Sequence, residues 1–408
     1  MEALAKLRLS TFDGDDELSS DLLTCLSVCG PILQPSDLCI KKPAEILCEI
    51  ANGSIYVDSL MGIVVSRVEI LKSIHGAFSA NKRSLEVAEN SVLTALEDNR
   101  FSSGSKHPRF WYVRRLGGWP GQTGIGQRVA LIDTGISGNH HCLTRFTPDD
   151  DFTSLERGVT SAQDRSDHGT CCAGIIGARS NCDERIGVAS DCRLIVGQIL
   201  PGVNSDRLLS VEWALLTSWA LHCRGARVIS LSYGIKKEKL SAAINVNVYS
   251  RVATRLRQRN AALVFCSAGK RGPVVYPAAA KGMVAVGAYQ PAGSDYRKIV
   301  ASSNSGGVSE APAVDSQLIL GPGVELVTTG KPTIAGGPCV TELFGGTSGA
   351  CAFVAGVAAL YMEGYPTWTV EQILAQMFAD AEDVPHPSDP NRSFKGIRFP
   401  RAANRECC

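Results

Sequence analysis

The chain has 408 residues, 44% of them hydrophobic and 20% charged, and its formal net charge is +1 at pH 7. This composition is ordinary for a globular protein with a sizeable core, and the length suits one large domain with a smaller one. So small a charge gives no electrostatic reason to expect nucleic acid or an anionic membrane as a partner. No stretch approaches the roughly 20 uninterrupted apolar residues of a membrane-spanning helix, so we expect no transmembrane segment.

The first ten residues carry charges at Glu2, Lys6 and Arg8 and lack the apolar core of a secretory signal. The 15 cysteines are an odd number and are spread along the whole chain. Unbonded cysteine behaves as a small buried hydrophobe, and the missing signal favours a reducing compartment. We therefore expect most cysteines to be reduced and structural, and the protein to be cytoplasmic.

Apolar residues recur at three- and four-residue steps through the first hundred residues, a spacing typical of helices. Helices are predicted at residues 15–28, 42–51, 57–77 and 84–99. The serine- and glycine-containing stretch at 100–108 has the composition of a linker. Residues 1–105 are therefore predicted to form a small helical domain with a regulatory or pro-domain role, or one that binds a partner.

After residue 128 the pattern changes to short apolar runs that alternate with amphipathic stretches. Buried strands are predicted at residues 129–132, 192–200, 226–231, 261–267 and 283–288, and helices at 206–223 and 240–259. This alternation predicts an α/β domain over residues 106–385, with a mainly parallel sheet covered by helices on both faces. Residues 386–408 are predicted to form a C-terminal tail. Ligands of such sheets bind beyond the carboxyl ends of the strands, and Asp133 ends the first run.

Three segments offer the groups that nucleophilic catalysis by a serine requires. A hydroxyl is a weak nucleophile at neutral pH, so it needs a histidine base and an acid that orients that base. Asp133 ends a buried strand, His168 opens a helix of small residues, and Ser348 opens an apolar, alanine-rich helix. Taken singly, each segment is as well explained by a turn or a helix cap. In combination they indicate an Asp-His-Ser triad.

These segments resemble the three motifs of the subtilisin-like peptidases, in that family's order of Asp, His and Ser, and the resemblance covers roughly residues 117–379. It implies the family's α/β fold and a serine endopeptidase acting through an acyl-enzyme. Ser348 would attack, His168 would shuttle the proton and Asp133 would hold the imidazole. Peptide or protein substrates are implied, and no cofactor.

The same resemblance implies where substrate binds. The stretch at residues 228–234 resembles the family's substrate-binding strand, so Ser232, Tyr233 and Gly234 are expected to pair with the peptide backbone and to form one wall of the specificity pocket. The strand end at Ser267, Ala268 and Gly269 is expected to contribute the other substrate-binding residues. Adding a substrate strand to a sheet edge is a general way to hold an extended peptide.

The residue after this strand end departs from the family pattern. The family places an asparagine there as a side-chain donor to the oxyanion, whereas this chain has Lys270. An ammonium on a flexible stem could replace that donor in part, alongside the backbone N–H of Ser348 at its helix start. Lys270 also suggests an alternative from another class, a pseudoenzyme whose cleft only binds peptides.

Two further departures follow the serine. Gly349 replaces a bulky neighbour of the nucleophile, and Ala352 replaces a helix proline. Emptier space beside the acyl group would favour attack by an amine over water, so a peptide ligase or macrocyclase using the same acyl-enzyme is a second alternative. The segment 272–277 is short, which leaves the side-chain preference open.

Metal sites are not assigned from the sequence. Near Asn181 only Asp183 and Glu184 offer carboxylates, whereas calcium takes six to eight oxygen ligands, so calcium stays possible but unassigned. The cysteines of the N-terminal region lack a paired zinc-binding spacing, so core packing is favoured over a zinc site for Cys25, Cys29, Cys39 and Cys48. Secreted relatives carry a small αβ propeptide, and the helical pattern here favours a regulatory or partner-binding module instead.

Overall fold

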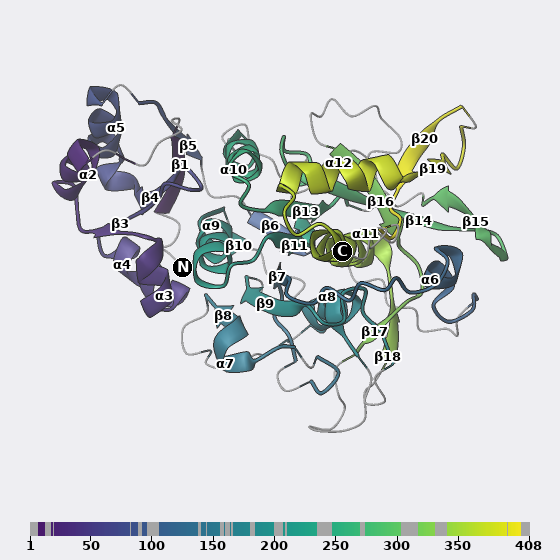
Figure 1. Ribbon diagram of the computed structural model, residues 1–408. Helices are drawn as coiled ribbons and strands as arrows, with labels where there is room; N and C mark the ends of the chain where they lie inside the picture. The colour runs from purple at the N-terminus through teal and green to yellow at the C-terminus, as the bar shows by residue number, and fades with distance from the viewer. Residues whose placement is uncertain are drawn as a thin grey trace.

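A computed structural model (Figure 1) describes residues 7–12, 18, 20–81, 83–88, 92–95, 106–137, 140–143, 145–155, 159, 164, 166–179, 184–199, 207–208, 210–234, 247–269, 274–302, 317–330, 341–389 and 391–400. Figure 1 shows a small N-terminal unit, in purple, beside a larger unit built around a twisted sheet. None of the helices in these residues combines the length and the apolar character that crossing a membrane requires.

The larger unit contains a ten-stranded sheet. Its strands are β7 (Arg128–Asp133), β8 (Phe152–Ser154), β9 (Arg193–Gln198), β11 (Val228–Leu231), β13 (Leu263–Ser267), β14 (Val284–Ala292), β15 (Asp295–Ala301), β16 (Gln317–Pro322), β19 (Glu382–Pro385) and β20 (Ser393–Gly396). The order is β19-β20-β16-β14-β13-β11-β7-β9-β8, and β15 pairs with β14. All neighbours are parallel except β19 on β20 and β15 on β14. The predicted mainly parallel sheet is confirmed.

Helices cover both faces of this sheet, as its strand residues require. The helices and the remaining strands of the larger unit are α6 (Trp111–Arg115), α7 (Pro148–Asp151), α8 (His168–Gly177), α9 (Ser210–Ser218), η2 (Trp219–Cys223), α10 (Asn247–Gln258), α11 (Gly346–Gly364), α12 (Val370–Asp380), β17 (Leu326–Thr329) and β18 (Thr341–Phe344). Successive residues of a strand point to opposite faces. In β7, Val129 and Leu131 pack with α8 and α11, whereas Ala130 and Ile132 pack with α9 and α10.

Helix α11 is deeply buried. Its residues are buried without a break from Gly346 to Met362. It packs against β11, β13, β14 and β16 as well as against α8 and α12. Small residues make this close packing possible, since a Cβ added at Gly356 would lie 2.8 Å from Val188 Cβ.

The predicted C-terminal tail, residues 386–408, needs a correction. It includes β20, which lies in the large sheet between β19 and β16. Ile397 and Phe399 follow this strand and are buried in the core. The sheet therefore extends beyond residue 385.

The prediction that residues 1–105 form a small helical domain is wrong, although helices lie within the predicted ranges 15–28 and 42–51. The N-terminal unit has a five-stranded sheet of order β2-β3-β4-β1-β5, made of β1 (Leu7–Phe12), β2 (Ile32–Leu33), β3 (Ile55–Asp58), β4 (Ile63–Arg67) and β5 (Leu85–Ala88). Its helices are α2 (Ser20–Ser27), α3 (Pro35–Ile40), α4 (Pro43–Ala51), η1 (Val68–Ile70) and α5 (Leu71–Ala80). Residues 57–77 therefore contain a hairpin, whose turn includes Gly62 with φ of +66°, before α5 begins.

The N-terminal sheet is buried on both faces, and this explains the error. Ile55, Val57 and Val64 pack with residues of α2 and α5, whereas Tyr56 and Val65 pack with residues of α9 and α10. Continuous apolar runs that are buried on both sides match helical and strand spacings equally well. The N-terminal unit thus sits on α9 and α10, on the far side of these helices from the large sheet (Figure 1).

A separate three-stranded sheet joins the two units. It consists of β10 (Arg207–Leu208), β6 (Val92–Ala95) and β12 (Tyr233–Gly234), with β6 in the middle. Strand β6 lies within the predicted helix at residues 84–99, so that helix is wrong as well. It follows that the chain leaves the N-terminal unit as an extended strand.

The expectation of reduced cysteines needs a correction at three positions. Cys39 and Cys223 form a disulfide, and Cys142 is also disulfide-bonded. Eight other cysteines of the described residues are thiols, and five of them are buried. The location of the protein stays a prediction.

Candidate active site

Asp133 and His168 form a buried pair at the carboxyl end of β7. Asp133 is the last residue of β7 and His168 is the first residue of α8. The Nδ1–H of His168 donates to Asp133 Oδ1 over 2.7 Å, and both residues are 1% exposed. A carboxylate in this position holds the imidazole in one orientation and one tautomer.

A second carboxylate lies beside these two residues. Asp164 is buried and accepts hydrogen bonds from Thr134 Oγ1 at 2.9 Å, and from Thr170 N at 2.8 Å and Thr170 Oγ1 at 2.7 Å. Thr134 Oγ1 in turn accepts from Gly169 N at 2.9 Å. Asp164 therefore ties the end of β7 to the start of α8. Sequence reasoning missed it, because an acid four residues before a histidine is not distinctive.

Ser348 lies in the first turn of α11 and is 4% exposed. Helices α8 and α11 pack against each other, and Phe344, just before α11, places its ring edge-on to the imidazole of His168 with centroids 5.5 Å apart. Ser232 Oγ donates to the backbone carbonyl of Ser348 at 3.5 Å. The structure therefore brings the start of α11, the start of α8 and the end of β11 to the same edge of the sheet.

Cys172 lies beneath this group. Its Sγ is 4.0 Å from His168 Nδ1 and 4.0 Å from Ser232 Oγ. Burial, and then the negative charge of Asp133, raise the pKa of the Cys172 thiol well above its ordinary value. Asp133, His168 and Cys172 each place one potential metal-ligand atom within 4.8 Å of the others. A thiol held protonated is a poor metal ligand, and the carboxylate is already bonded to the imidazole, so we assign no metal here.

The expected substrate strand is occupied by the chain's own β6. Antiparallel pairing places Ala95 opposite Tyr233 and Thr94 opposite Gly234. On its other edge β6 pairs with β10, with Leu93 opposite Arg207. Both edges of an extended segment are thus hydrogen-bonded, and Ser232, the neighbour of Tyr233, contacts Ser348. Sequence reasoning missed β6, because nothing local in residues 92–95 identifies a pairing partner so far along the chain.

The two predicted walls of the specificity pocket enclose a side chain. Ser267 and Ala268 are buried, and Gly269 follows them with φ of +94°. A Cβ added at Gly234 would lie 2.5 Å from Val275 Cγ2, and one at Gly269 would lie 2.9 Å from Val275 Cγ1. The Val275 isopropyl group therefore lies between Gly234 and Gly269 and fills part of the predicted specificity pocket. Only the short spacing of residues 272–277 hinted at this.

The opening expected beside Gly349 is absent. A Cβ added there would come within 2.9 Å of Leu326 Cδ1 and 3.3 Å of Phe344 Cδ1. Leu326 and Phe344 therefore fill the space that a side chain at position 349 would take. Lys270, Asn181 and Asp183 lie outside the described residues, so the predictions that concern them stay predictions.

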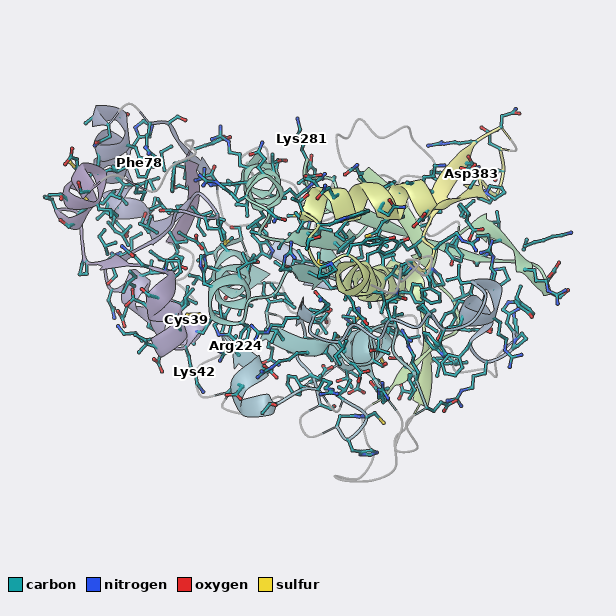
Figure 2. The ribbon with its side chains drawn as sticks, viewed as in Figure 1. Cys39, Lys42, Phe78, Arg224, Lys281 and Asp383 are labelled. Carbon is teal, nitrogen blue, oxygen red and sulfur yellow. A yellow bond between two sulfur atoms is a disulfide. The ribbon has the colours of Figure 1, made fainter. Side chains whose placement is uncertain are left out.

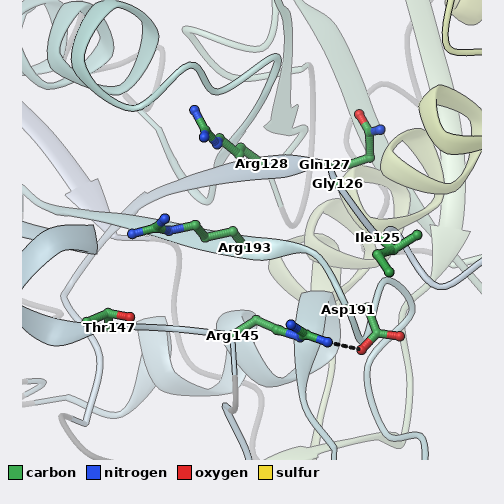
Figure 3. A pocket seen from close by; sticks show the side chains of 8 residues that line it. All are labelled: Ile125, Gly126, Gln127, Arg128, Arg145, Thr147, Asp191 and Arg193. Carbon is green, nitrogen blue, oxygen red and sulfur yellow. Dashed lines mark ion pairs between the residues drawn. The ribbon is translucent and has the colours of Figure 1, made fainter.

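A cavity of about 420 Å³ lies at the opposite edge of the sheet, where β7 and β9 begin (Figure 3). Arg145 pairs with Asp191 at 3.6 Å, and Arg193 pairs with Asp151 at 2.7 Å. Figure 3 shows the side chains of Arg128 and Arg193 both extending toward the left of the view, and Arg128 donates to the backbone carbonyl of Arg224 at 2.9 Å. Guanidinium groups that already have these partners do not form an anion site, so we assign no ligand to this cavity.

Comparison with known proteins identifies the family to which the chain is similar. Residues 124–395 match the Subtilase family model. Subtilisin NAT of Bacillus subtilis subsp. natto is 31% identical over 263 residues, 62% of this chain and 60% of that protein. Subtilisin of Bacillus pumilus is 31% identical, over 62% of this chain and 82% of that protein. The thermostable alkaline protease of Halalkalibacterium halodurans is 32% identical, over 65% of this chain and 64% of that protein. The match thus spans under two thirds of subtilisin NAT.

Solved structures share the fold. A cold adapted subtilisin-like serine proteinase superimposes with a TM-score of 0.52 at 23% identity, covering 69% of this chain and 91% of that one. MycP1 from Mycobacterium smegmatis gives a TM-score of 0.52 at 22% identity, covering 76% of this chain and 88% of that one. Because the family model matches well over half of its residues, the chain belongs to the subtilase family.

Proposed function

We propose that this chain is a serine endopeptidase that cuts peptide bonds through an acyl-enzyme. Ser348 Oγ attacks the carbonyl carbon while His168 takes its proton, and the imidazolium then donates that proton to the leaving amine. A water molecule, deprotonated by the same imidazole, releases the acyl group. Asp133 keeps Nδ1 protonated and turns Nε2 toward the reaction. Free N–H groups at the start of α11 suit the developing oxyanion.

The proposal depends above all on the buried hydrogen bond of 2.7 Å between His168 and Asp133. A buried carboxylate beside an imidazole is what a general base needs to stabilise its protonated form. Ser348 lies in the first turn of the helix that packs against α8, and the homologous subtilisins support a peptidase role.

Strand β6 supports a peptide as the substrate. It lies extended between β10 and β12 and pairs with both through its backbone, as a substrate peptide would. Its last residue, Ala95, pairs with Tyr233, the neighbour of Ser232, and the Ser232 hydroxyl donates to the backbone carbonyl of Ser348. The N-terminal unit with β6 then acts as a pro-domain that blocks the cleft until the chain is cut downstream of Ala95.

Val275 supports a preference for small side chains on the amino side of the cut bond. The walls at Gly234 and Gly269 lack side chains, yet Val275 fills the space between them. A large aromatic side chain would have to displace this isopropyl group. Peptides with alanine or glycine at that position are therefore the proposed substrates.

Labelling with a fluorophosphonate tests the activity. Such reagents react with a serine only where a base activates it. Once the N-terminal unit is removed, we therefore expect one label on Ser348, none on the Ser348→Ala variant, and strongly reduced labelling of His168→Ala. A folded protein that stays unlabelled after removal of the N-terminal unit would make it the pseudoenzyme. Hydrolysis alone at high amine concentration, with no amine-transferred product, would exclude the ligase.

A further inference from the structure

We propose that the Cys39–Cys223 disulfide is a redox latch, which keeps the N-terminal unit on the peptidase unit after the chain between them is cut. Reduction of this bond by a dithiol then releases the unit and opens the cleft. The inference rests on the proposed function, because release matters only if the blocked cleft is an active site.

The disulfide joins the two units directly. Cys39 belongs to α3 of the N-terminal unit, and Cys223 ends η2, which continues α9 of the peptidase unit. The two residues are 184 positions apart, and their Cα atoms are 5.1 Å apart. Figure 2 shows Cys39 on the side of the N-terminal unit that meets the peptidase unit, close to Arg224. Cys39 is exposed and Cys223 is half-buried, so a reductant can reach the bond.

A small polar network lies beside the disulfide. Asp58 of β3 is fully buried, and its Oδ2 accepts from Ser218 Oγ at 2.5 Å and lies 3.1 Å from His222 Nε2. The hydroxyls of Tyr56 and Ser218 are 2.6 Å apart. Farther along the interface, Arg255 donates to the backbone carbonyls of Ser59 and Leu60. These contacts orient the N-terminal unit on α9, η2 and α10.

The interface is not closed at this point. A cavity of about 350 Å³ lies between the units, lined on one side by Gln34, Pro35 and Asp58 and on the other by His222 and Arg259. Polar contacts around a cavity hold less tightly than a packed apolar seam, because unfilled space forfeits dispersion contacts. The two units also share apolar packing between Tyr56 and Val65 and the helices α9 and α10, and the gap interrupts it at this end of the interface. The covalent bond next to the gap therefore holds the units together where packing is absent.

The latch has a simple consequence after cleavage. In the intact chain, residues between Ala95 and the peptidase unit already connect the two parts, and hydrolysis removes that connection. The disulfide then keeps the inhibitor at an effective concentration on the order of millimolar, far above any working concentration of the enzyme. Reduction converts the disulfide and a dithiol into two protein thiols and the oxidised dithiol, and the unit is free to leave. In a reducing cytoplasm the latch would stand open.

The first test uses the inactive Ser348→Ala variant, so that it does not depend on peptidase activity. This variant carries the recognition sequence of a specific protease between Ser103 and Gly104, and that protease makes the cut. After that cut, we expect one co-eluting particle in size exclusion without reductant. Excess dithiol, or the Cys39→Ser substitution without any dithiol, should give two separate parts. Cys48→Ser removes a thiol of the same unit and should co-elute like the parent. The Cys39→Ser arm matters because reductant also opens the bond at Cys142. Separation of the oxidised parent, or co-elution of the Cys39→Ser parts, overturns the latch.

The active chain provides the second measurement. Once cut, it should show little peptidase activity at nanomolar concentration, and dithiol should raise that activity at least about tenfold. The cut Cys39→Ser chain should be active without dithiol. Full activity of the oxidised cut chain overturns the latch as a control on activity. Absence of fluorophosphonate labelling in all variants refutes the proposed function instead, and the size-exclusion result still decides the latch.

Discussion

Replacing Gly169 by alanine tests how closely the start of α8 is fitted to the end of β7. A Cβ at this position would lie 2.0 Å from the carbonyl oxygen of Gly135, whereas real contacts of this kind are at least 3.0 Å. One of the two segments therefore has to move by about 1 Å, and such a misplacement at a reacting group costs on the order of 10²-fold in rate. His168 is the preceding residue, so the shift falls on the imidazole and its bond to Asp133. Overpacking should also cost about 1–3 kcal/mol of unfolding free energy.

The assay is the rate of fluorophosphonate labelling, with urea unfolding measured in parallel. Gly76→Ala in α5 is the matched control, because a Cβ there meets nothing within 4 Å. Alanine in a helix interior is favoured over glycine by about 0.8–1.0 kcal/mol, so the control should be slightly more stable and should label at the parent rate. If Gly169→Ala labels as fast as the control, the fit between β7 and α8 does not set the position of His168.

Two further predictions concern specificity and pH. Val275→Gly should open the space between the two glycine walls and raise kcat/KM for a phenylalanine peptide relative to an alanine peptide by about 10–200-fold, whereas an unchanged ratio would show that Val275 does not limit the pocket. His140 is buried, its Nε2–H donates to Gly330 O at 3.0 Å and its Nδ1 accepts from Cys142 N at 3.3 Å. Burial lowers the pKa of His140 in the folded protein, so the unfolded chain binds the proton more readily. The contribution of His140 to the unfolding free energy should therefore be fully present above pH ~6.5 and should be lost as the pH falls below that value. Urea unfolding at several pH values measures this loss. An equal fall in the His140→Gln variant would contradict the prediction.

The large sheet was predictable because its strands are short, continuous apolar runs bounded by turn residues. Strands β7, β9, β11 and β13 each lie at a predicted run, since parallel strands buried on both faces need apolar residues at every position. Asp133, His168 and Ser348 stood out for a chemical reason, because three motifs with an acid, a base and a nucleophile followed each other in the order that one mechanism uses. Asp133 and His168 meet because the strand that ends at Asp133 and the helix that begins at His168 lie next to each other in this fold.

The parts that could not be predicted depend on residues far apart in the chain. The pairing of β6 with β12 joins positions about 140 residues apart, and the Cys39–Cys223 bond joins positions separated by 184. Asp164 and Val275 are ordinary in sequence and gain their roles only from what faces them. The N-terminal sheet was misjudged because its apolar runs fit two periodicities, and only tertiary packing chooses between them.

Because α11 is deeply buried, Ser348 keeps its position for as long as the whole peptidase unit stays folded. A helix enclosed over residues 346–362 cannot loosen while the sheet around it stays intact. Local fraying at the surface would leave Ser348 where it is, whereas any event that uncovers this helix melts the unit cooperatively. Heating should therefore abolish labelling of Ser348 at the temperature at which the protein unfolds, and not before.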